Sequence, residues 1–370
     1  MVVLDAAGRL HGLTARPVRA VGAAPRPGTS YPEGVPDSLS ATTQRRFAWS
    51  TPLRTRFRNL DARDGLLLRG DAGWGELSPF WEYDDGESAA WLCAAREAAD
   101  VGFPAPVRDV VPVNVTVPAV GPEQAREIVL ASGGCTTAKV KVGQRLAHGA
   151  VEPVEAERER VAAVRAAFDE LGTPGAAIRV DVNGTWTVDD ALRRVPLLDA
   201  AARGLEYVEQ PCGTVEELAA VRRGVDVPVA ADESIRRAAD PLRVVRAEAA
   251  DVVVLKVQPL GGVRACLDLA AQVGLPVVVS SALESSVGLA AGVALAAALP
   301  ELPYACGLAT SQLLTRDVTD RPLLPEGGAL PVRRVAPDPG ALAAVAPSAE
   351  LEQRWFARHD RLADLLDAAA

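Results

Sequence analysis

Short valine-rich runs alternate with charged stretches over most of this 370-residue chain. The runs are typical of buried strands, and the stretches between them, such as residues 155–171, carry apolar side chains at helical spacing. Strands that alternate with helices about every 25 residues indicate parallel βαβ units. Eight strand-like runs follow one another, and they begin at Val111, Thr137, Ala177, Leu205, Val227, Asp251, Leu275 and, most weakly, Tyr304.

Eight such units are what a closed barrel requires. We therefore predict an α/β fold, a modified (β/α)8 or TIM barrel, for residues 111–332. A doubly wound open sheet is the competing arrangement, but it usually has a glycine-rich phosphate loop after its first strand, and none follows residues 111–117.

The chain ends have a different pattern. Residues 46–110 combine short alternating runs and turns, which are typical of antiparallel strands, with a helical segment. Residues 333–370 are predicted to be helical and to pack back on that region. Residues 1–45 are rich in Pro, Gly, Ser and Arg, and we predict an irregular or disordered extension there.

The overall composition excludes several classes of protein. A net charge of −9 provides no basic surface for nucleic acid or an anionic membrane. The most apolar run, Val287–Leu299, is too short to span a bilayer and predicts a buried helix, and no signal-peptide pattern opens the chain. We therefore expect a cytoplasmic protein with a small-molecule substrate and no nucleic-acid or membrane partner. The sequence favours neither a monomer nor a homo-oligomer.

Charged residues gather at the predicted carboxyl ends of consecutive strands, where barrel enzymes carry their active sites. Their neighbours in the strands are apolar, as residues that face the surrounding helices should be. These charged and polar residues are Lys139, Lys141, Arg179, Asp181, Asn183, Glu209, Asp232, Glu233 and Lys256.

Each of these residues has an ordinary explanation when it is taken alone. A lone pair of alternating lysines is more often a solvated strand face, and a lone aspartate at a strand end often caps a helix. Independent explanations of this kind rarely coincide at one end of successive strands. Because buried unpaired charge is very costly, these groups must pair with one another or with an ion.

Three of these residues form an oxygen-only set of possible metal ligands, and they follow three successive strands: Asp181, Glu209 and Asp232. Such a set favours Mg²⁺ over zinc. A lysine near another ammonium and a divalent cation has a lowered pKa, so it can act as a neutral base near pH 7. A divalent cation with a lysine base suits the removal of a proton next to a carboxylate, because the cation stabilises the resulting enediolate.

The order of the motifs resembles the enolase superfamily, specifically its muconate-lactonising branch, and within it the o-succinylbenzoate synthases of the actinobacterial type. The resemblance runs from about Arg54 to the C-terminal region. It rests on KVK, DVN, VEQP, ADES, LKVQPLGG and SSALESSVGL in this order, together with GWGELSPFWEY and VPVNVTVPAV. It implies a modified barrel under an α+β capping domain, which both chain ends form.

The resemblance also implies roles for individual residues. Asp181, Glu209 and Asp232 correspond to the Mg²⁺ ligands. Lys141 corresponds to the base, Lys139 to a residue that tunes its pKa, and Lys256 to a cation on the other side of the substrate. Glu233 would orient Lys256, with Asn183 beside it. Candidates for contacts with the substrate carboxylates are Arg179, Ser280 and Ser281.

The implied reaction is the Mg²⁺-dependent dehydration of 2-succinyl-6-hydroxy-2,4-cyclohexadiene-1-carboxylate to o-succinylbenzoate, a step of menaquinone biosynthesis. The main alternative is an N-succinyl- or N-acylamino acid racemase or a dipeptide epimerase, because Lys141 and Lys256 could supply a base on each face of a substrate. A non-catalytic barrel would lack at least one ligand or lysine, and none is missing. The segment before about Gln44 has no counterpart in the family pattern.

Overall fold

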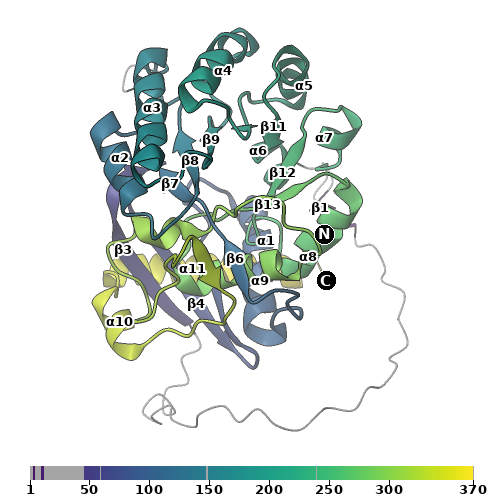
Figure 1. Cartoon of the computed structure of the whole chain (residues 1–370). Helices are drawn as coiled ribbons and strands as arrows, with labels where there is room; N and C mark the ends of the chain where they lie inside the picture. Colours follow the sequence, from purple (N-terminus) through teal and green to yellow (C-terminus); the bar gives the residue numbers. More distant parts are fainter. Residues whose placement is uncertain are drawn as a thin grey trace.

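The barrel is built on one curved sheet of seven parallel strands. The structure is a computed structural model that describes residues 3–4, 10–11, 46–58, 60–146, 149–238 and 240–369. Within these residues the strands pair in chain order (Figure 1). They are β7 (Val115–Val117), β8 (Thr137–Lys141), β9 (Ala177–Asp181), β10 (Val208–Glu209), β11 (Val229–Ala231), β12 (Val252–Leu255) and β13 (Val277–Val279).

Residues 305–307 close the barrel between its first and last strands. The backbone N–H of Gly307 donates to Val279 O at 2.8 Å on the side of β13. On the side of β7, Cys306 donates to Pro112 O at 2.7 Å, and Asn114 donates to Cys306 O at 2.9 Å. The eighth and weakest predicted run thus completes the barrel through isolated parallel bridges.

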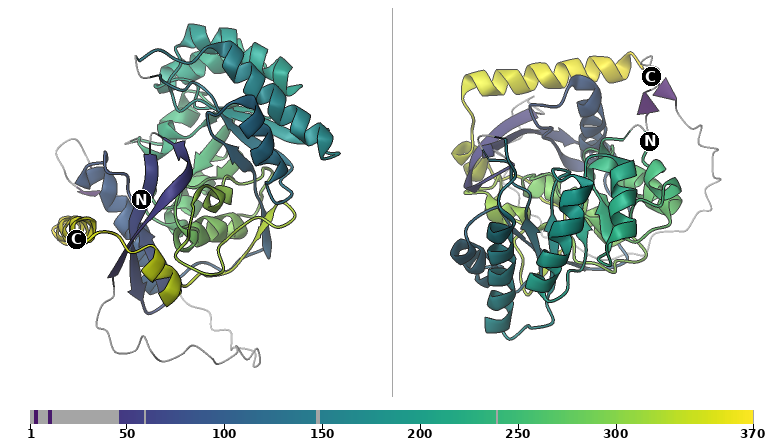
Figure 2. Two further views of the ribbon diagram at one scale, coloured as in Figure 1. Left: turned by 90° about the vertical axis from the view of Figure 1, so that its left-hand side faces the viewer. Right: turned by 90° about the horizontal axis from the view of Figure 1, so that it is seen from above.

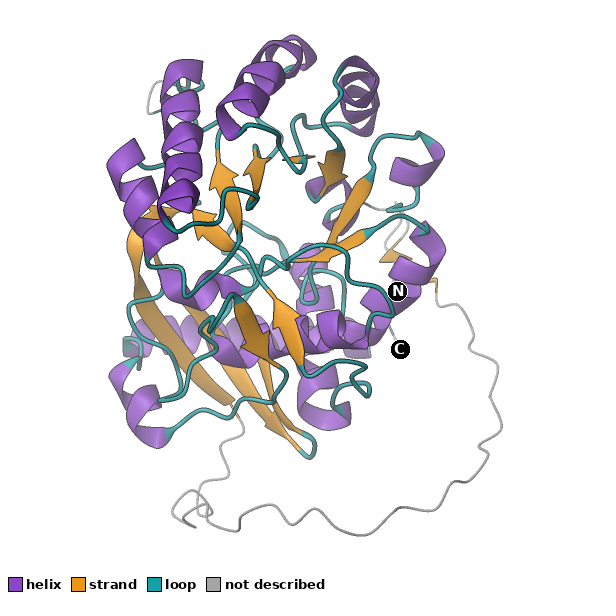
Figure 3. Cartoon of the chain, viewed as in Figure 1, coloured by secondary structure: helices purple, strands orange, loops and turns teal. Residues whose placement is uncertain are grey.

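Helices cover the outside of the sheet, as Figures 1 and 3 show. Their apolar faces pack on strand valines such as Val140 and Val180, both fully buried in the main core. The helices are α2 (Pro122–Leu130), α3 (Val154–Glu170), α4 (Val188–Ala202), α5 (Val215–Gly224), α6 (Glu233–Arg236), α7 (Arg243–Arg246), α8 (Val263–Val273) and α9 (Ser286–Ala298). The apolar run at Val287–Leu299 lies mainly in α9, which is buried as predicted.

A second layer, the cap, lies against the barrel. It contains an antiparallel sheet of β3 (Arg46–Phe57), β4 (Leu60–Gly70) and β5 (Gly73–Leu77). A helical segment follows this sheet, α1 (Asp85–Arg96) with the π-helical turn η2 (Glu97–Val101). The long C-terminal helix α11 (Ala349–Asp367) runs along the cap (Figure 2), where Trp355 Nε1 donates to Asp64 Oδ1 at 2.8 Å.

The remaining elements connect these two layers or lie at the chain ends. The segment after the barrel includes η3 (Ala309–Leu313), β14 (Ala329–Pro331) and α10 (Pro339–Ala344). The short strands β1 (Val3–Leu4) and β2 (Leu10–His11) pair with each other. The rest of the predicted extension at residues 1–45 lies outside the described residues.

The first predicted barrel strand is two strands in the structure. β6 (Val110–Pro112) pairs antiparallel with β14, and only β7 joins the barrel sheet. The prediction of one continuous strand over residues 111–117 was therefore wrong, because the chain changes partners at Val113 and Asn114, where it instead meets residues 305–307. Among the described residues, no helix has the length and apolar character needed to cross a membrane.

Candidate active site

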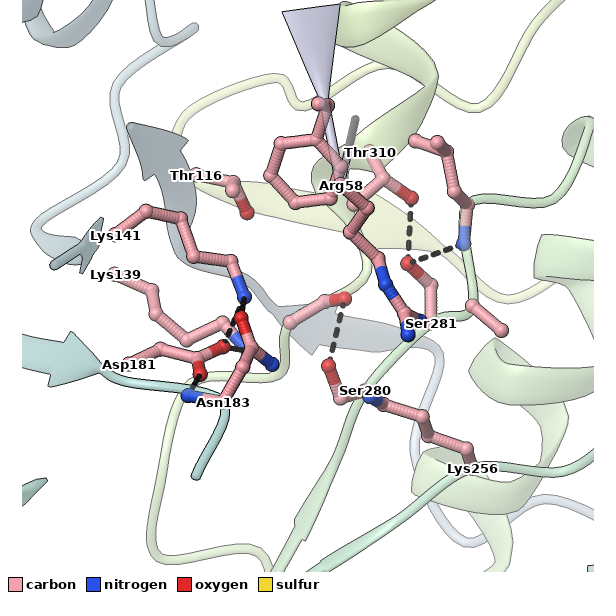
Figure 4. A pocket seen from close by; sticks show the side chains of 14 residues that line it. Arg58, Thr116, Lys139, Lys141, Asp181, Asn183, Lys256, Ser280, Ser281 and Thr310 are labelled. Atoms are coloured by element: carbon pink, nitrogen blue, oxygen red, sulfur yellow. Dashed lines mark hydrogen bonds and ion pairs between the residues drawn. The ribbon is translucent and has the colours of Figure 1, made fainter. Parts of the chain in front are cut away.

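A pocket opens at the carboxyl ends of the barrel strands, between the barrel and the cap (Figure 4). The ends of β8 and β9, the residue after β12 and the loop after β13 form most of its wall. The cap adds two residues at the end of β3. The lining residues are Phe57, Arg58, Thr116, Lys139, Lys141, Asp181, Asn183, Lys256, Ser280, Ser281, Ala282, Leu283, Gly307 and Thr310.

Lys139 and Lys141 project from one face of β8, because side chains two apart in a strand point the same way. Lys139 Nζ lies 3.0 Å from Glu209 Oε1 and 3.1 Å from Asp181 Oδ2. Lys141 Nζ lies 2.5 Å from the same oxygen of Asp181 and donates to Asn183 Oδ1 at 2.7 Å. Two ammonium groups thus share one buried aspartate.

Asp232 and Lys256 form a second pair across the barrel end. Asp232 is fully buried directly after β11, and Lys256 follows β12. Lys256 Nζ lies 2.6 Å from Asp232 Oδ2, while Arg236 Nε donates to Asp232 Oδ1 at 2.9 Å. Both oxygens of this carboxylate therefore bind a positively charged side chain.

Asn183 and Glu233 connect the two groups. Asn183 Nδ2 donates to Glu233 Oε1 at 3.2 Å, and Arg236 donates to the same oxygen at 2.7 Å. The backbone of Asn183 has a φ of 52°, in the left-handed region that asparagine tolerates better than most residues. The structure thus brings together the predicted lysines and carboxylates, but Glu233 contacts Asn183 and Arg236, and it is Asp232 that pairs with Lys256, which Glu233 was predicted to orient.

Comparison with known proteins gives a clear relationship. The Enolase N-terminal domain-like family matches residues 48–99, and the Enolase C-terminal domain-like family matches residues 122–345. The chain is 67% identical over 288 residues to the o-succinylbenzoate synthase of Thermobifida fusca (strain YX), which covers 78% of this chain and 87% of that protein. This chain belongs to the o-succinylbenzoate synthase family of the enolase superfamily.

Other relatives agree with this membership. The o-succinylbenzoate synthase of Mycolicibacterium smegmatis is 50% identical over 325 residues, which are 88% of this chain and 97% of that protein. The muconate lactonizing enzyme of Pseudomonas fluorescens has the same fold, with a TM-score of 0.68 at 21% identity over 82% of this chain and 98% of that one. The predicted family, fold class and class of enzyme are therefore confirmed.

The pKa values of Lys139 and Lys141 shift in opposite directions. Burial lowers the pKa of Lys141, and the ammonium of Lys139 lowers it further, against the attraction of Asp181. Burial also opposes the charge of Lys139, but Glu209 and Asp181 outweigh it and raise the pKa of Lys139 well above its usual range. Of the two lysines on β8, Lys141 is thus the one that loses its proton more readily.

The three carboxylates also differ from one another. Burial and repulsion by Asp181 raise the pKa of Glu209 to about 7. Burial would raise the pKa of Asp181 too, but Lys141 and Lys139 hold it well below its usual range. Arg236 and Lys256 likewise overcome burial and keep the pKa of Asp232 low. The site therefore holds at least two carboxylates that ionise readily although they are buried.

The three predicted metal ligands already pair with positively charged side chains. In the ranges that the structure describes, no three or more His, Cys, Asp or Glu side chains are spaced to hold a metal ion. Asp181 and Glu209 nevertheless lie opposite each other in the register of β9 and β10, and Lys139 Nζ contacts both. Together with Asp232 they offer only carboxylate oxygens, a donor set that fits a hard cation such as Mg²⁺.

Arg179 does not reach the pocket. It lies on β9 two residues before Asp181, one layer deeper in the barrel. Its Nε donates to Glu206 Oε2 at 2.8 Å, its Nη1 donates to Ala305 O at 2.8 Å, and its guanidinium lies 4.6 Å from the ring centroid of Tyr207. Because these contacts occupy Arg179, the geometry does not support its predicted role in binding the substrate.

Ser280 and Ser281 do line the pocket. Ser280 Oγ lies near Gly307 O at 3.5 Å, and Ser281 Oγ shares a hydrogen bond of 2.7 Å with Thr310 Oγ1. Thr116 and Thr310 also line the pocket and were not predicted, whereas Phe57 and Arg58 lie in the cap segment around residues 52–63, where the residues that select the substrate were expected without being singled out. Arg58 has a φ of 51°, which turns the chain at the rim of the pocket.

One signal in the sequence went unused. The chain has 39 basic residues of the Lys and Arg types, and only three of them are lysines, Lys139, Lys141 and Lys256. All three line this pocket. Since arginine is not deprotonated in proteins, whereas a buried lysine is readily shifted toward its neutral form, this distribution points to amine chemistry at the site.

Proposed function

We propose that this chain catalyses the dehydration of 2-succinyl-6-hydroxy-2,4-cyclohexadiene-1-carboxylate to o-succinylbenzoate, with Lys141 as the base. The observation that most strongly supports this proposal is that all three lysines line one pocket and pair there with Asp181, Glu209 and Asp232. The 67% identity to a protein named for this product supports the choice of substrate.

Lys141 removes the proton next to the ring carboxylate. Its lowered pKa favours the neutral amine, and Asn183 and Asp181 hold Nζ at the pocket wall. The protonated Lys141 then donates to the departing hydroxyl. One proton and one hydroxide leave as water, and the ring becomes aromatic, so the elimination runs downhill.

Lys256 stabilises the substrate from another side of the pocket. Figure 4 shows Lys141 and Lys256 extending from different parts of the wall. An ammonium against the face of a conjugated ring attracts its electrons, and this attraction increases when water is excluded. Asp232 fixes Nζ of Lys256, with Glu233 bound to the same arginine as Asp232.

The polar groups near the cap bind the substrate carboxylates. Ser280, Ser281 and Thr310 present hydroxyls, and Arg58 presents a guanidinium, whose planar fork suits a carboxylate. Phe57 supplies an apolar surface next to Lys141, whose Nζ lies 5.4 Å from the ring centroid. A substrate with two carboxylates and an apolar ring matches this lining.

Asp181, Glu209 and Asp232 would hold the Mg²⁺ of this site. When bound, the cation stabilises the negative charge that develops on the substrate carboxylate as the proton leaves. The carboxylates end or directly follow neighbouring strands, although in this structure the described side chains are not spaced to hold an ion together.

An ultraviolet assay of the purified protein tests this proposal. We expect Mg²⁺-dependent loss of the diene absorbance, which a chelator abolishes and added Mg²⁺ restores. Lys141→Ala should lower kcat by about three orders of magnitude, the range for loss of a general base. Arg126→Ala is the control, because it removes an exposed cation that pairs with Glu170 on the outside of the barrel. No turnover by folded wild-type protein with Mg²⁺ would refute the proposed function.

The second candidate is racemisation of N-succinyl amino acids. It is favoured by one observation, that Lys141 and Lys256 line the same pocket, so each could exchange a proton on one face of a substrate. The test is exchange of the α-proton in D₂O, followed by NMR. Loss of exchange from one enantiomer only in each single lysine variant would identify this activity.

A further inference from the structure

We propose that Arg236 is a positioning residue that ties two of the pocket lysines, Lys141 and Lys256, to the cap, and that Tyr83 anchors it there. This inference rests on the proposed function, because it assigns Arg236 to the alignment of Lys141 and Lys256. It arises from the contacts of one buried guanidinium, which binds two carboxylates of the barrel end and one hydroxyl of the cap.

Arg236 uses all three of its nitrogens. It lies at the end of the short helix α6 with only 7% of its surface exposed. Nε donates to Asp232 Oδ1 at 2.9 Å, Nη2 donates to Glu233 Oε1 at 2.7 Å, and Nη1 donates to the hydroxyl of Tyr83 at 2.7 Å. The rigid fork therefore sets three partners at fixed angles, which a lysine ammonium does not do.

Two branches lead from Arg236 to the lysines. The first is short, since Asp232 accepts from Arg236 with one oxygen and from Lys256 with the other. The second passes through Glu233 Oε1, which also accepts from Asn183, whose Oδ1 accepts from Lys141. A shift of the guanidinium would thus displace both ammonium groups, and no other described residue contacts both Asp232 and Glu233 through a side-chain hydrogen bond.

The cap holds Tyr83, the third partner of Arg236, firmly in place. Tyr83 is buried among aromatic rings, with centroids 5.6 Å from Phe80 and 6.1 Å from Trp91. Arg358 of α11 donates to Tyr83 O at 2.7 Å. The tyrosine hydroxyl is therefore a fixed point, provided by the cap, against which the barrel end is set.

The chain offers a matched control in the next residue. Arg237 also contacts Tyr83, with its guanidinium 5.1 Å from the ring centroid, and it bridges to the cap through Glu87 at 2.7 Å. Arg237 is exposed, and its side-chain hydrogen bonds go to Glu87, which is not a carboxylate of the site. Both arginines thus join barrel to cap, but only Arg236 reaches the lysines.

The experiment compares three variants, Tyr83→Phe, Arg236→Lys and Arg237→Gln, with wild-type protein in saturating Mg²⁺. Tyr83→Phe keeps the aromatic ring and removes only the hydroxyl. We expect kcat to fall about 10-fold in Tyr83→Phe and up to about 100-fold in Arg236→Lys, the range for residues that orient an active group. The control should stay within about twofold, as exposed ion pairs contribute little.

Binding of o-succinylbenzoate, measured by calorimetry, separates positioning from simple docking of the cap. Phe57 and Arg58 of the cap line the pocket, so a displaced cap would weaken binding of this product. We expect the product Kd of Tyr83→Phe to stay near that of wild-type protein while kcat falls. If Arg236→Lys does not fold, Tyr83→Phe alone decides.

Two results would overturn the inference. One is a Tyr83→Phe protein with the kcat of the wild type, and the other is a fall in kcat that Arg237→Gln reproduces together with weaker product binding. Failure of the proposed function is a different result, since wild-type protein would then show no turnover at all.

Discussion

Glu209 at the barrel end and Glu76 in the cap strand β5 are both fully buried, and burial raises the pKa of each to about 7. A second carboxylate adds to the rise in both places, Asp181 beside Glu209 and Glu284 beside Glu76. The two regions differ in the groups that oppose the shift. At Glu209 the charge of Lys139 opposes the shift, whereas at Glu76 hydrogen bonds from two neutral serines oppose it more than the charge of Arg63 does.

The donors around Glu76 are fixed parts of the fold. Ser78 Oγ donates to Glu76 Oε1 at 2.7 Å, and the backbone N–H groups of Ser285 and Gly288 donate at 3.2 and 3.1 Å. These last two lie at the start of α9, where a helix favours negative charge. Glu76 thus joins the cap to the barrel, and its side chain does not line the pocket.

Glu209 has a partner that also belongs to the pocket. Lys139 contacts Glu209 and Asp181 together and lines the pocket itself. The contrast teaches that a displaced pKa does not by itself identify a catalytic group. The two glutamates differ in their surroundings. Lys139, which opposes the shift at Glu209, lines the pocket and can contact a ligand there, whereas the groups that oppose the shift at Glu76 do not line it.

The largest effect that sharpens this contrast is expected for Glu209→Gln. The variant keeps the shape of the side chain but loses one charge of the proposed Mg²⁺ site, so turnover should fall at least about 100-fold, as for loss of a key electrostatic group. Mg²⁺ should raise the unfolding midpoint of wild-type protein and leave that of the variant nearly unchanged, because binding to the native state is lost.

Calorimetric scans with and without Mg²⁺ measure this difference. Glu76→Gln serves as the control, since it makes the same chemical change at a buried glutamate away from the pocket. An undiminished Mg²⁺ response in Glu209→Gln would remove Glu209 from the ligand set.

A smaller effect is expected for Glu76→Gln, and it depends on pH. The pKa of Glu76 rises from 4.5 to about 7 on folding, so its contribution to stability is fully present below pH 4.5 and is lost as the pH rises through 7. Glutamine does not titrate. The stability of the wild type relative to the variant should therefore fall by about 3 kcal/mol between these pH values.

Urea unfolding of both proteins from pH 4.5 to 8 measures this difference, in which other titrating groups largely cancel. Glu284 and Arg63 face Glu76 as well and remain in both proteins. A difference that does not change with pH would show that Glu76 ionises normally in the folded protein.

Sequence reasoning succeeded for the barrel because strand alternation is a local pattern. The period of two placed Lys139 and Lys141 on one face, and the strand ends brought Asp181, Glu209 and Asp232 to one end of the sheet. The same rule failed for Arg179. Its phase was right, but phase does not specify depth, and the structure places Arg179 one layer below the pocket.

Residues from distant parts of the chain could not be predicted in this way. Phe57 and Arg58 reach the pocket because the cap sheet docks on the barrel, and Thr310 reaches it through a turn after the closing segment. Neither docking nor closure leaves a periodic signal in the sequence. The role of Glu76 was hidden for the same reason, since its partner Ser285 lies 209 residues away.

The smallest effect tests the other side of the junction around Glu76. Ser285 caps α9, because its Oγ accepts from Val287 N at 3.2 Å, and it also donates to Glu76. Ser285→Ala removes both interactions. At pH 5 the unfolding free energy should fall by about 1 kcal/mol, the usual cost of a lost helix cap. At pH 8, where Glu76 is charged, the loss should grow to roughly 2 kcal/mol, because hydrogen bonds to charged groups are stronger.

The sign of this pH dependence makes the test specific. A serine that only capped the helix would cost the same at both pH values. In the double variant with Glu76→Gln the extra loss at pH 8 should disappear, since no charge is left for Ser285 to stabilise. Turnover should change little in any of these proteins, because neither Glu76 nor Ser285 lines the pocket.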